Sequence, residues 1–128
     1  MSRREARKAV LTALYQLEFL DHVELPVDEL GEQASFVRDI YDGTRTRMEE
    51  IDGLISKFAS GWRLERLAVI DRNILRMALY ELLYYQKTPP EVVINEAVEL
   101  SKKYGTEKSS SFINGILDRV WKEKSPAS

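Results

Sequence analysis

Residues 64–85 read LERLAVIDRNILRMALYELLYY, and this stretch decides the fold class. Its apolar side chains recur with helical spacing and cover most of the circumference of a helix, which is typical of a helix buried on several sides. Such a helix needs other helices around it. We therefore expect a short turn followed by a long central helix, with Asp71 as a candidate N-cap for a helix that begins at Arg72.

The remainder of the chain supplies helices that can surround this one. Apolar spacing is helical almost throughout, and no run alternates with period two for long enough to indicate a sheet. Residues 21–34 read as a connection that holds at most one short helix. Further helices are expected near residues 3–20, 35–59, 90–104 and from 106–110 to about 123, where the tail begins to fray. Gly43 and Gly53 weaken the case that the second of these is unbroken.

The fold class is therefore all-α, with about seven helices. The 128 residues fit one domain with a core of its own. The chain divides loosely near Gly61, so we expect two small bundles, about residues 1–60 and 61–124, packed as a single domain over residues 1–128.

Local signals indicate several helix ends. Ser2 followed by Glu5 is a capping-box pattern at the start of the first helix. Pro90 marks the start of another helix, and Gly105 marks its end. In the last helix the 3.6-residue spacing continues through Gly115, which we interpret as a close-packing position.

Composition excludes several classes of function. The chain has no cysteine, which excludes disulfides, thiolate metal sites and a thiol nucleophile. Its single histidine, His22, sits in a loop beside acids, and no glycine-rich phosphate loop, paired catalytic carboxylates or metal-ligand spacing is present. We expect no enzyme activity, no catalytic residue, no cofactor and no metal. Without a signal segment or a membrane-length apolar run, a cytoplasmic protein with no membrane partner is expected.

The first helix carries a local basic patch. With 19 Lys and Arg against 21 Asp and Glu, the chain has no global attraction for polyanions, so any nucleic-acid site must be local. At 100° per residue, the side expected to face the core holds Ala6, Ala9, Val10, Ala13 and Leu17. The opposite sector holds Arg4, Arg7, Lys8, Leu11 and Tyr15, with Arg3 at its edge.

Helix stability does not account for these cations, because positive charge in a first turn faces the positive end of the macrodipole. Cations beside an aromatic ring can neutralise phosphates of single-stranded RNA and stack on its bases. The alternative is a solvated charged face whose charges pair locally with Glu5 and Glu18.

Two other groups of polar residues have open interpretations. The start of the last helix combines exposed N–H groups, serine hydroxyls and Lys108, which suits a phosphate. Phe112 beside it is either core or a stacking platform, and core is favoured from the residues alone. In the central stretch, Asp71, Arg76 and Glu81 are either structural charges or a polar rim around a partner-binding surface.

Three stretches together resemble the NusB family of bacterial transcription antitermination factors. They are RREARKAVLTALYQ at the start, IDRNILRMALYELLY in the middle, and PPEVVINEAVELSKKYGTEKSSSFINGILDRV near the end. The last of these is the most distinctive. The resemblance implies a helical fold of two small bundles and an RNA-binding role rather than catalysis.

The resemblance also implies partners and site residues. Family members pair with NusE, the small-subunit ribosomal protein that doubles as a transcription factor. The pair binds boxA in nascent RNA and acts on the RNA polymerase elongation complex, so that ribosomal RNA operons are transcribed through terminators. The resemblance, taken together with the exposed face of the first helix, implies a set of RNA contacts. They are Arg3, Arg4, Arg7, Lys8, Tyr15, Lys108, Ser110, Ser111 and Phe112. The NusE contacts expected from it are Asp71, Arg76 and Glu81.

Two residues depart from the pattern of some members. Glu5 interrupts the run of arginines, and Lys108 stands where an acid occurs. Two alternatives stay open: a protein-interaction bundle without RNA specificity, and an RNA-binding module of the type attached to ribosomal RNA methyltransferases. Some members of the family self-associate, so a homodimer also stays open.

Overall fold

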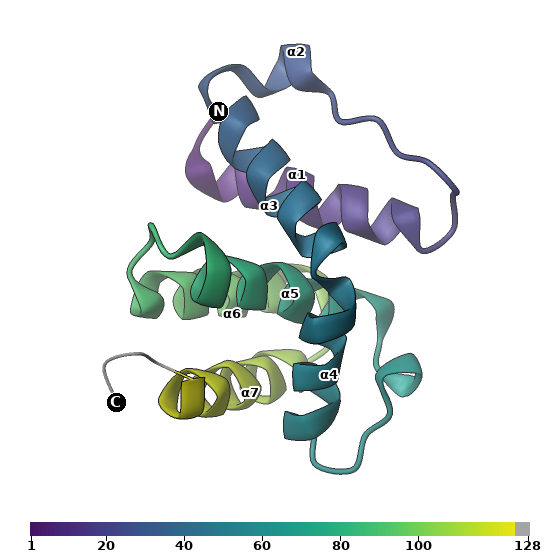
Figure 1. Cartoon of the computed structure of the whole chain (residues 1–128), viewed down its shortest axis with the longest axis vertical. Helices are drawn as coiled ribbons and strands as arrows, with labels where there is room; N and C mark the ends of the chain where they lie inside the picture. The colour runs from purple at the N-terminus through teal and green to yellow at the C-terminus, as the bar shows by residue number, and fades with distance from the viewer. Residues whose placement is uncertain (125–128) are drawn as a thin grey trace.

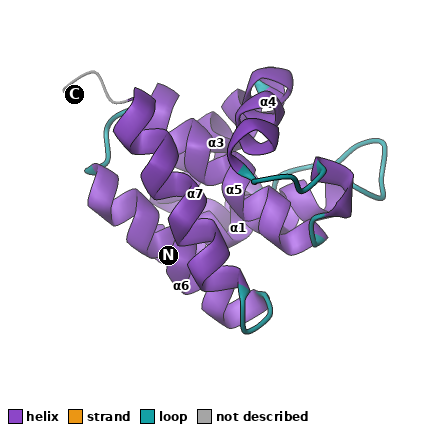
Figure 2. Cartoon of the chain, turned by 90° about the horizontal axis from the view of Figure 1, so that it is seen from below, coloured by secondary structure: helices purple, strands orange, loops and turns teal. Residues whose placement is uncertain are grey.

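The computed structural model describes residues 1–124, which form helices and loops and contain no strand (Figure 2). The all-α prediction is confirmed. The helices are α1 (Arg3–Leu17), α2 (Val27–Leu30), α3 (Ala34–Thr46), α4 (Met48–Phe58), α5 (Val69–Tyr80), α6 (Pro90–Tyr104) and α7 (Ser109–Lys124). Short 3-10 turns occupy Gly31–Gln33 and Leu64–Arg66, and a π-helical turn, Glu81–Tyr85, follows α5. None of the helices formed by residues 1–124 combines the length and apolar character needed to cross a membrane.

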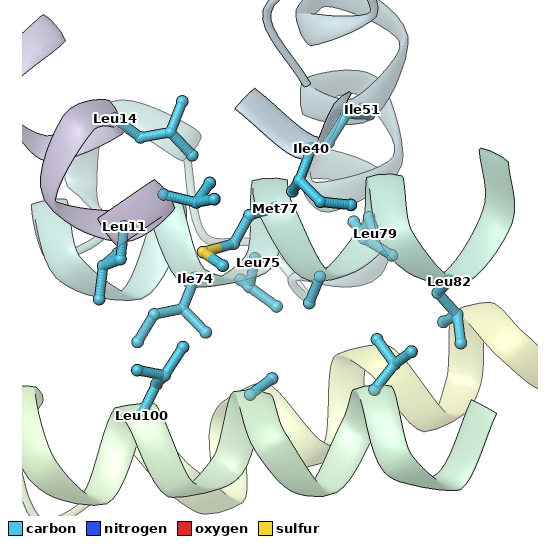
Figure 3. Packing of buried hydrophobic residues seen from close by; sticks show 14 of the residues in the cluster. Leu11, Leu14, Ile40, Ile51, Ile74, Leu75, Met77, Leu79, Leu82 and Leu100 are labelled. Atoms are coloured by element: carbon cyan, nitrogen blue, oxygen red, sulfur yellow. The ribbon is translucent and has the colours of Figure 1, made fainter. Parts of the chain in front are cut away.

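Helix α5 is the centre of the fold. It packs against α1, α3, α4, α6 and α7. In Figure 1, α1 and α3 lie above it, α7 lies below it, and α6 overlaps it. Figure 3 shows its side chains Ile74, Leu75, Met77 and Leu79 pointing toward Leu14 of α1, Ile40 of α3 and Leu100 of α6. The nearly continuous apolar surface of α5 is therefore covered by the helices that surround it. The division into two bundles near residue 60 stays a prediction, because α5 contacts helices of both halves.

The N-terminus of α1 is built as its sequence predicts. Ser2 Oγ accepts a hydrogen bond from the Glu5 backbone N–H at 3.0 Å, and the Ser2 backbone N–H donates to Glu5 Oε1 at 3.0 Å. Both bonds of a capping box are present. The helix ends at Leu17, a little earlier than the periodicity predicts.

The start of α5 differs from the prediction. Leu67 and Ala68 adopt extended backbone after the 3-10 turn, with ψ of 148° and 139°, so the helix begins at Val69 with Ala68 at the N-cap position. The expectation that Asp71 caps a helix starting at Arg72 is wrong. Asp71 lies instead in the first turn, where its charge is favourable to the helix macrodipole.

The helix expected over residues 35–59 is broken, but not at a glycine. The break is at Arg47, whose φ of −106° and ψ of 18° separate α3 from α4. Gly43 lies inside α3, where the ring of Tyr80 packs against the position that a side chain would occupy. Gly53 lies on the exposed side of α4. The first of these glycines therefore serves the packing of α3 against α5.

Helices α6 and α7 form a hairpin around Gly105. A Cβ at Gly105 would lie 2.5 Å from Ser109 Oγ and 2.8 Å from the Ser101 carbonyl oxygen, so glycine is needed here for space. In α7 the buried apolar residues are Ile113, Ile116, Leu117 and Val120. Gly115 lies off that face, and a Cβ added there would meet no atom within 4 Å, so the close-packing interpretation of Gly115 is wrong. Helix α7 extends through Lys124, so the expectation that the tail frays from about residue 123 is wrong for residues 123–124, and the rest of that expectation lies outside the described residues.

Candidate nucleic-acid interface

One side of α1 presents cations and an aromatic ring to solvent. Arg3, Arg4 and Lys8 are exposed, and Tyr15 is 40% exposed. We call these four residues the α1 strip. Their exposure confirms what the helical wheel predicts for them, although it does not test whether they bind RNA.

Arg7 is the exception, and its predicted exposure is wrong. Its side chain is only 5% exposed. Arg7 Nε donates to Glu81 Oε1 at 3.0 Å, and Arg7 Nη2 donates to Glu81 Oε2 at 2.6 Å. Leu11, one turn further along α1, is also buried. A helical wheel assigns one buried sector, whereas α1 packs against both α3 and α5, which widens that sector to include Arg7 and Leu11.

The strip residues are held by neighbouring elements. The guanidinium carbon of Arg3 lies 3.9 Å from the centroid of the Phe36 ring of α3, a cation–π geometry. Arg4 Nε donates to Glu96 Oε2 of α6 at 3.0 Å. The Lys8 ammonium lies 5.8 Å from the centroid of the Tyr104 ring. Each cation is therefore oriented by a contact to another helix while it stays accessible to solvent.

Glu5 stays charged beside this strip. The Ser2 backbone N–H is the largest cause that lowers the pKa of Glu5, because it donates to the carboxylate. Glu5 therefore serves the capping box and also places a negative charge next to Arg4 and Lys8.

A groove of about 350 Å³ separates the start of α1 from the second half of α6. Arg4 and Lys8 line it on one side, and Lys102 and Lys103 line it on the other. In the sequence these two lysines are explained by the macrodipole of α6 alone. Their place opposite Arg4 and Lys8 becomes visible only once α1 and α6 are adjacent, so no local signal could have found it.

A second groove, of about 580 Å³, lies between the start of α5 and the start of α7. We call it the α5–α7 groove. Its lining brings together Lys108, Ser111 and Phe112, for which the resemblance implies RNA contacts, and Asp71, for which it implies a NusE contact. Lys108 and Ser111 are exposed, Phe112 and Ser110 are half-buried, and Ser109 is buried. Ser109 Oγ accepts a hydrogen bond from the Thr106 backbone N–H at 2.9 Å, which is a structural role.

Sequence reasoning misses two residues of this groove. Trp62, which is 59% exposed, and Arg66 complete its wall. A tryptophan followed by basic residues in GWRLER is an available signal in the sequence. Its position next to the start of α7 depends on tertiary packing.

The other two residues expected to contact NusE are used inside the chain. Glu81 is 2% exposed and is occupied by Arg7. The Arg76 side chain is 12% exposed; its Nε donates to Asp52 Oδ1 at 2.8 Å, and its Nη1 donates to Glu18 Oε2 at 3.1 Å. The interpretation of Glu81 and Arg76 as an exposed polar rim is wrong, because partners within the fold take up their charges.

Glu18 is the centre of this internal network. It accepts two hydrogen bonds of 2.7 Å from Arg72 and one of 2.9 Å from Asn73. The hydrogen bonds from Arg72 are the largest cause that lowers the pKa of Glu18 to about 2. The network fixes the end of α1 to α5 and thereby sets the direction of the α1 strip.

The chain matches the model of the NusB family over residues 4–122. It is 40% identical to the transcription antitermination protein NusB of Thermodesulfovibrio yellowstonii, and the match covers 97% of this chain and 94% of that protein. Membership of a family of transcription factors bears out the expectation that the chain is not an enzyme.

Solved structures agree with the sequence match. NusB of T. maritima superposes with a TM-score of 0.91 at 42% identity, covering 99% of this chain and 95% of that chain. A crystal structure of the antitermination factors NusB and NusE in complex with double-stranded RNA gives a TM-score of 0.82 at 28% identity, covering 94% of this chain and 96% of that chain. By sequence over nearly its whole length and by fold, this chain belongs to the NusB family of transcription antitermination proteins.

Proposed function

We propose that this protein binds boxA-like single-stranded RNA together with NusE, and that the assembly acts on the RNA polymerase elongation complex to support transcription of ribosomal RNA operons. Its mechanism is assembly rather than catalysis. Cations position the RNA backbone, and contacts to unpaired bases select the sequence.

The α1 strip carries the RNA part of this proposal. It places three exposed cations and an exposed ring on one helix, and the combination suits phosphate neutralisation and base stacking on a single strand. Lys102 and Lys103 line the other side of the groove beside α1, whose lining also includes Glu5, Glu96 and Glu99. Contacts to Phe36, Glu96 and Tyr104 hold the three cations in place, so fewer side-chain rotamers are lost when RNA binds.

The solved relatives support both partners. One of them is described in complex with NusE and double-stranded RNA, which makes an RNA and a NusE partner the first to test here. We propose single-stranded RNA as the physiological ligand, because in double-stranded RNA the base edges are largely inaccessible to side chains and sequence selection would be lost.

A titration tests the proposal. Fluorescently labelled boxA-like RNA and a strand with the same bases scrambled are titrated with the full-length protein, with and without NusE, alongside a duplex of the boxA-like strand. We expect the boxA-like single strand to bind more tightly than the scrambled strand and the duplex, and NusE to enlarge that difference. Equal affinity for all three RNAs under both conditions would defeat the proposal and favour a protein-interaction bundle.

A further inference from the structure

The groove between the start of α1 and the second half of α6 contains three acids, and each of them has a partner within the chain. They are Glu5, Glu96 and Glu99. Glu5 is bound in the capping box of α1, and Glu99 lies 3.6 Å from the Lys102 ammonium. Glu96 accepts a hydrogen bond of 3.0 Å from Arg4 Nε. The negative charge of the groove is therefore already matched.

The cations of the same groove are not all matched. Lys8 and Lys103 line it, and neither forms an ion pair with an acid among residues 1–124. Their ammonium groups lie 5.8 and 5.6 Å from the centroid of the Tyr104 ring. The groove therefore offers a polyanion these two lysines and the part of Arg4 that its pair with Glu96 leaves free.

Arg4 is held by one corner of its guanidinium. Its side chain is 65% exposed, and Nε is the only one of its three nitrogens that donates a hydrogen bond within the part of the chain that the structure describes. The other two nitrogens, Nη1 and Nη2, can donate together to two oxygens of a phosphate, which is the bidentate geometry that suits arginine. Arg4 can therefore keep Glu96 and bind a phosphate at the same time.

Glu96 is in turn held from the interior. Its side chain is 18% exposed, and its Oε1 lies 3.9 Å from Nη1 of the buried Arg7. Arg7 is itself fixed by two hydrogen bonds to Glu81. The charges thus alternate in sign from the buried pair through Glu96 to the exposed Arg4, and the attraction of Arg7 restricts the movement of the carboxylate that holds Arg4.

We propose that Glu96 is a positioning residue that makes RNA binding selective, because it restricts Arg4 to one direction. A fixed guanidinium meets a phosphate only where the strand follows a defined path, and that path depends on how the bases fit the α1 strip. The Glu96 carboxylate also repels phosphates that approach Arg4 in any other way. Glu96 therefore lowers affinity for other RNA sequences while a boxA-like strand keeps the Arg4 contact. This proposal rests on the proposed RNA-binding function.

Alanine at Glu96 tests this role. The full-length variant is titrated with labelled boxA-like and scrambled RNA in the presence of NusE. We expect affinity for the scrambled strand to rise, and the ratio of the two affinities to fall roughly 3- to 10-fold, the scale of ordering one long side chain on binding. The variant should fold, because Arg7 keeps both hydrogen bonds to Glu81.

Glu99→Ala is the matched control. It removes one carboxylate from the same helix and the same groove, but this carboxylate pairs with Lys102 and not with Arg4. We expect both RNAs to gain affinity alike, so the ratio should stay within about twofold of wild type.

A double-mutant cycle shows whether Glu96 acts through Arg4. Arg4→Ala by itself should lower the ratio of the two affinities. Adding Glu96→Ala to it should lower the ratio no further, because the group to be positioned is absent.

A measurement without RNA detects the positioning directly. The NMR order parameter of the Arg4 Nε–H bond reports motion of this side chain on the picosecond to nanosecond timescale. In the free protein it should be high in wild type, fall in Glu96→Ala and stay unchanged in Glu99→Ala.

The outcomes separate this proposal from the proposed function. An unchanged ratio in Glu96→Ala would make Glu96 only a nearby negative charge, and a further fall on top of Arg4→Ala would show that it does not act through Arg4. An Arg4 order parameter as low in wild type as in Glu96→Ala would show that Arg4 is not held. Each of these results overturns the positioning role and leaves the proposed function standing. If wild type binds both RNAs equally with and without NusE, both proposals fail.

Discussion

Arg7 and Glu81 form a bidentate ion pair in the interior of the fold, with N···O distances of 3.0 and 2.6 Å. The pair joins the second turn of α1 to the π-helical turn that follows α5. Both side chains are almost fully buried, at 5% and 2% exposure. Each charge therefore depends on the other for its hydrogen bonds.

Breaking this pair should destabilise the fold strongly. Glu81→Ala removes both hydrogen bonds of the buried Arg7 guanidinium and leaves it only the Glu96 carboxylate at 3.9 Å. We expect the free energy of unfolding to fall by about 3 kcal/mol, measured by urea denaturation. Replacing both residues by methionine should recover most of that loss, because two apolar side chains of similar volume leave no buried charge. Arg4→Met, which breaks an ion pair whose arginine is 65% exposed, should change stability by less than about 1 kcal/mol.

The variant with methionine at both Arg7 and Glu81 also tests whether Arg7 belongs to the RNA-binding surface. Because Glu81 occupies the Arg7 guanidinium, Arg7→Met with Glu81→Met should leave the salt dependence of RNA binding as in wild type. A clear decrease in that salt dependence would restore Arg7 to the RNA site.

Lys8 should contribute one phosphate contact. In Lys8→Ala, the slope of log affinity against log salt concentration for boxA-like single-stranded RNA should become shallower by roughly 0.7, because one fewer counterion-releasing contact is made. The slope is measured by fluorescence anisotropy at several potassium chloride concentrations. Lys57→Ala, at an exposed lysine of α4 that pairs with Glu123 at 3.0 Å, is the control and should keep the wild-type slope. Equal slopes for all three proteins would remove Lys8 from the interface.

Glu18 should make stability depend on pH in the acid range. Its pKa is lowered from 4.5 to about 2 in the folded protein, so its stabilising contribution is complete above pH 4.5 and is lost as the pH falls toward 2. Between pH 6 and pH 3 the folded protein should lose about 2 kcal/mol through this group. We expect the difference in free energy of unfolding between wild type and Glu18→Gln to shrink by that amount over the same range.

Urea denaturation of both proteins at the two pH values measures this difference. Glu32→Gln removes one exposed carboxylate outside the network. It is the control that shows how much the free energy of unfolding changes with pH when any one carboxylate is lost. A difference between wild type and Glu18→Gln that does not change with pH would contradict the assignment of the network to Glu18.

Two glycines in neighbouring helices should respond oppositely to alanine. At Gly43 an added Cβ collides with the ring of Tyr80, whose hydroxyl donates to Asp39 Oδ1 at 2.8 Å. Gly43→Ala should therefore destabilise by about 1 to 3 kcal/mol, as overpacking does. At Gly53 nothing lies within 4 Å, and Gly53→Ala should stabilise by about 0.5 to 1 kcal/mol through helix propensity. Thermal unfolding of both variants and of wild type measures these changes. The packing argument would be refuted if the unfolding temperatures of both variants shifted in the same direction from that of wild type.

Much of the fold follows from local signals. The periodicity of residues 64–85 is sufficient to predict a central helix, because a helix that is apolar around its circumference must be covered on all sides. The capping box at Ser2 and Glu5 and the start at Pro90 involve only residues within one turn of each other. Positions that depend on a neighbouring helix are less predictable. The periodicity favours Gly115 as a packing glycine, whereas within the helices it is Gly43 of α3 that lies against a side chain of another helix, Tyr80 of α5.

The candidate site likewise combines features that the sequence predicts with features that only tertiary packing determines. The sequence by itself determined the all-α class, the capped first helix, the family, and the exposure of Arg3, Arg4, Lys8 and Tyr15. Tertiary structure alone decided that Arg7 turns inward to Glu81, and that Trp62 and Asp71 meet Phe112 in one groove. The physical reason is the separation along the chain over which each effect acts. Helical periodicity and capping act within a few residues, whereas the burial of a charge or the lining of a groove depends on which distant helix packs beside it.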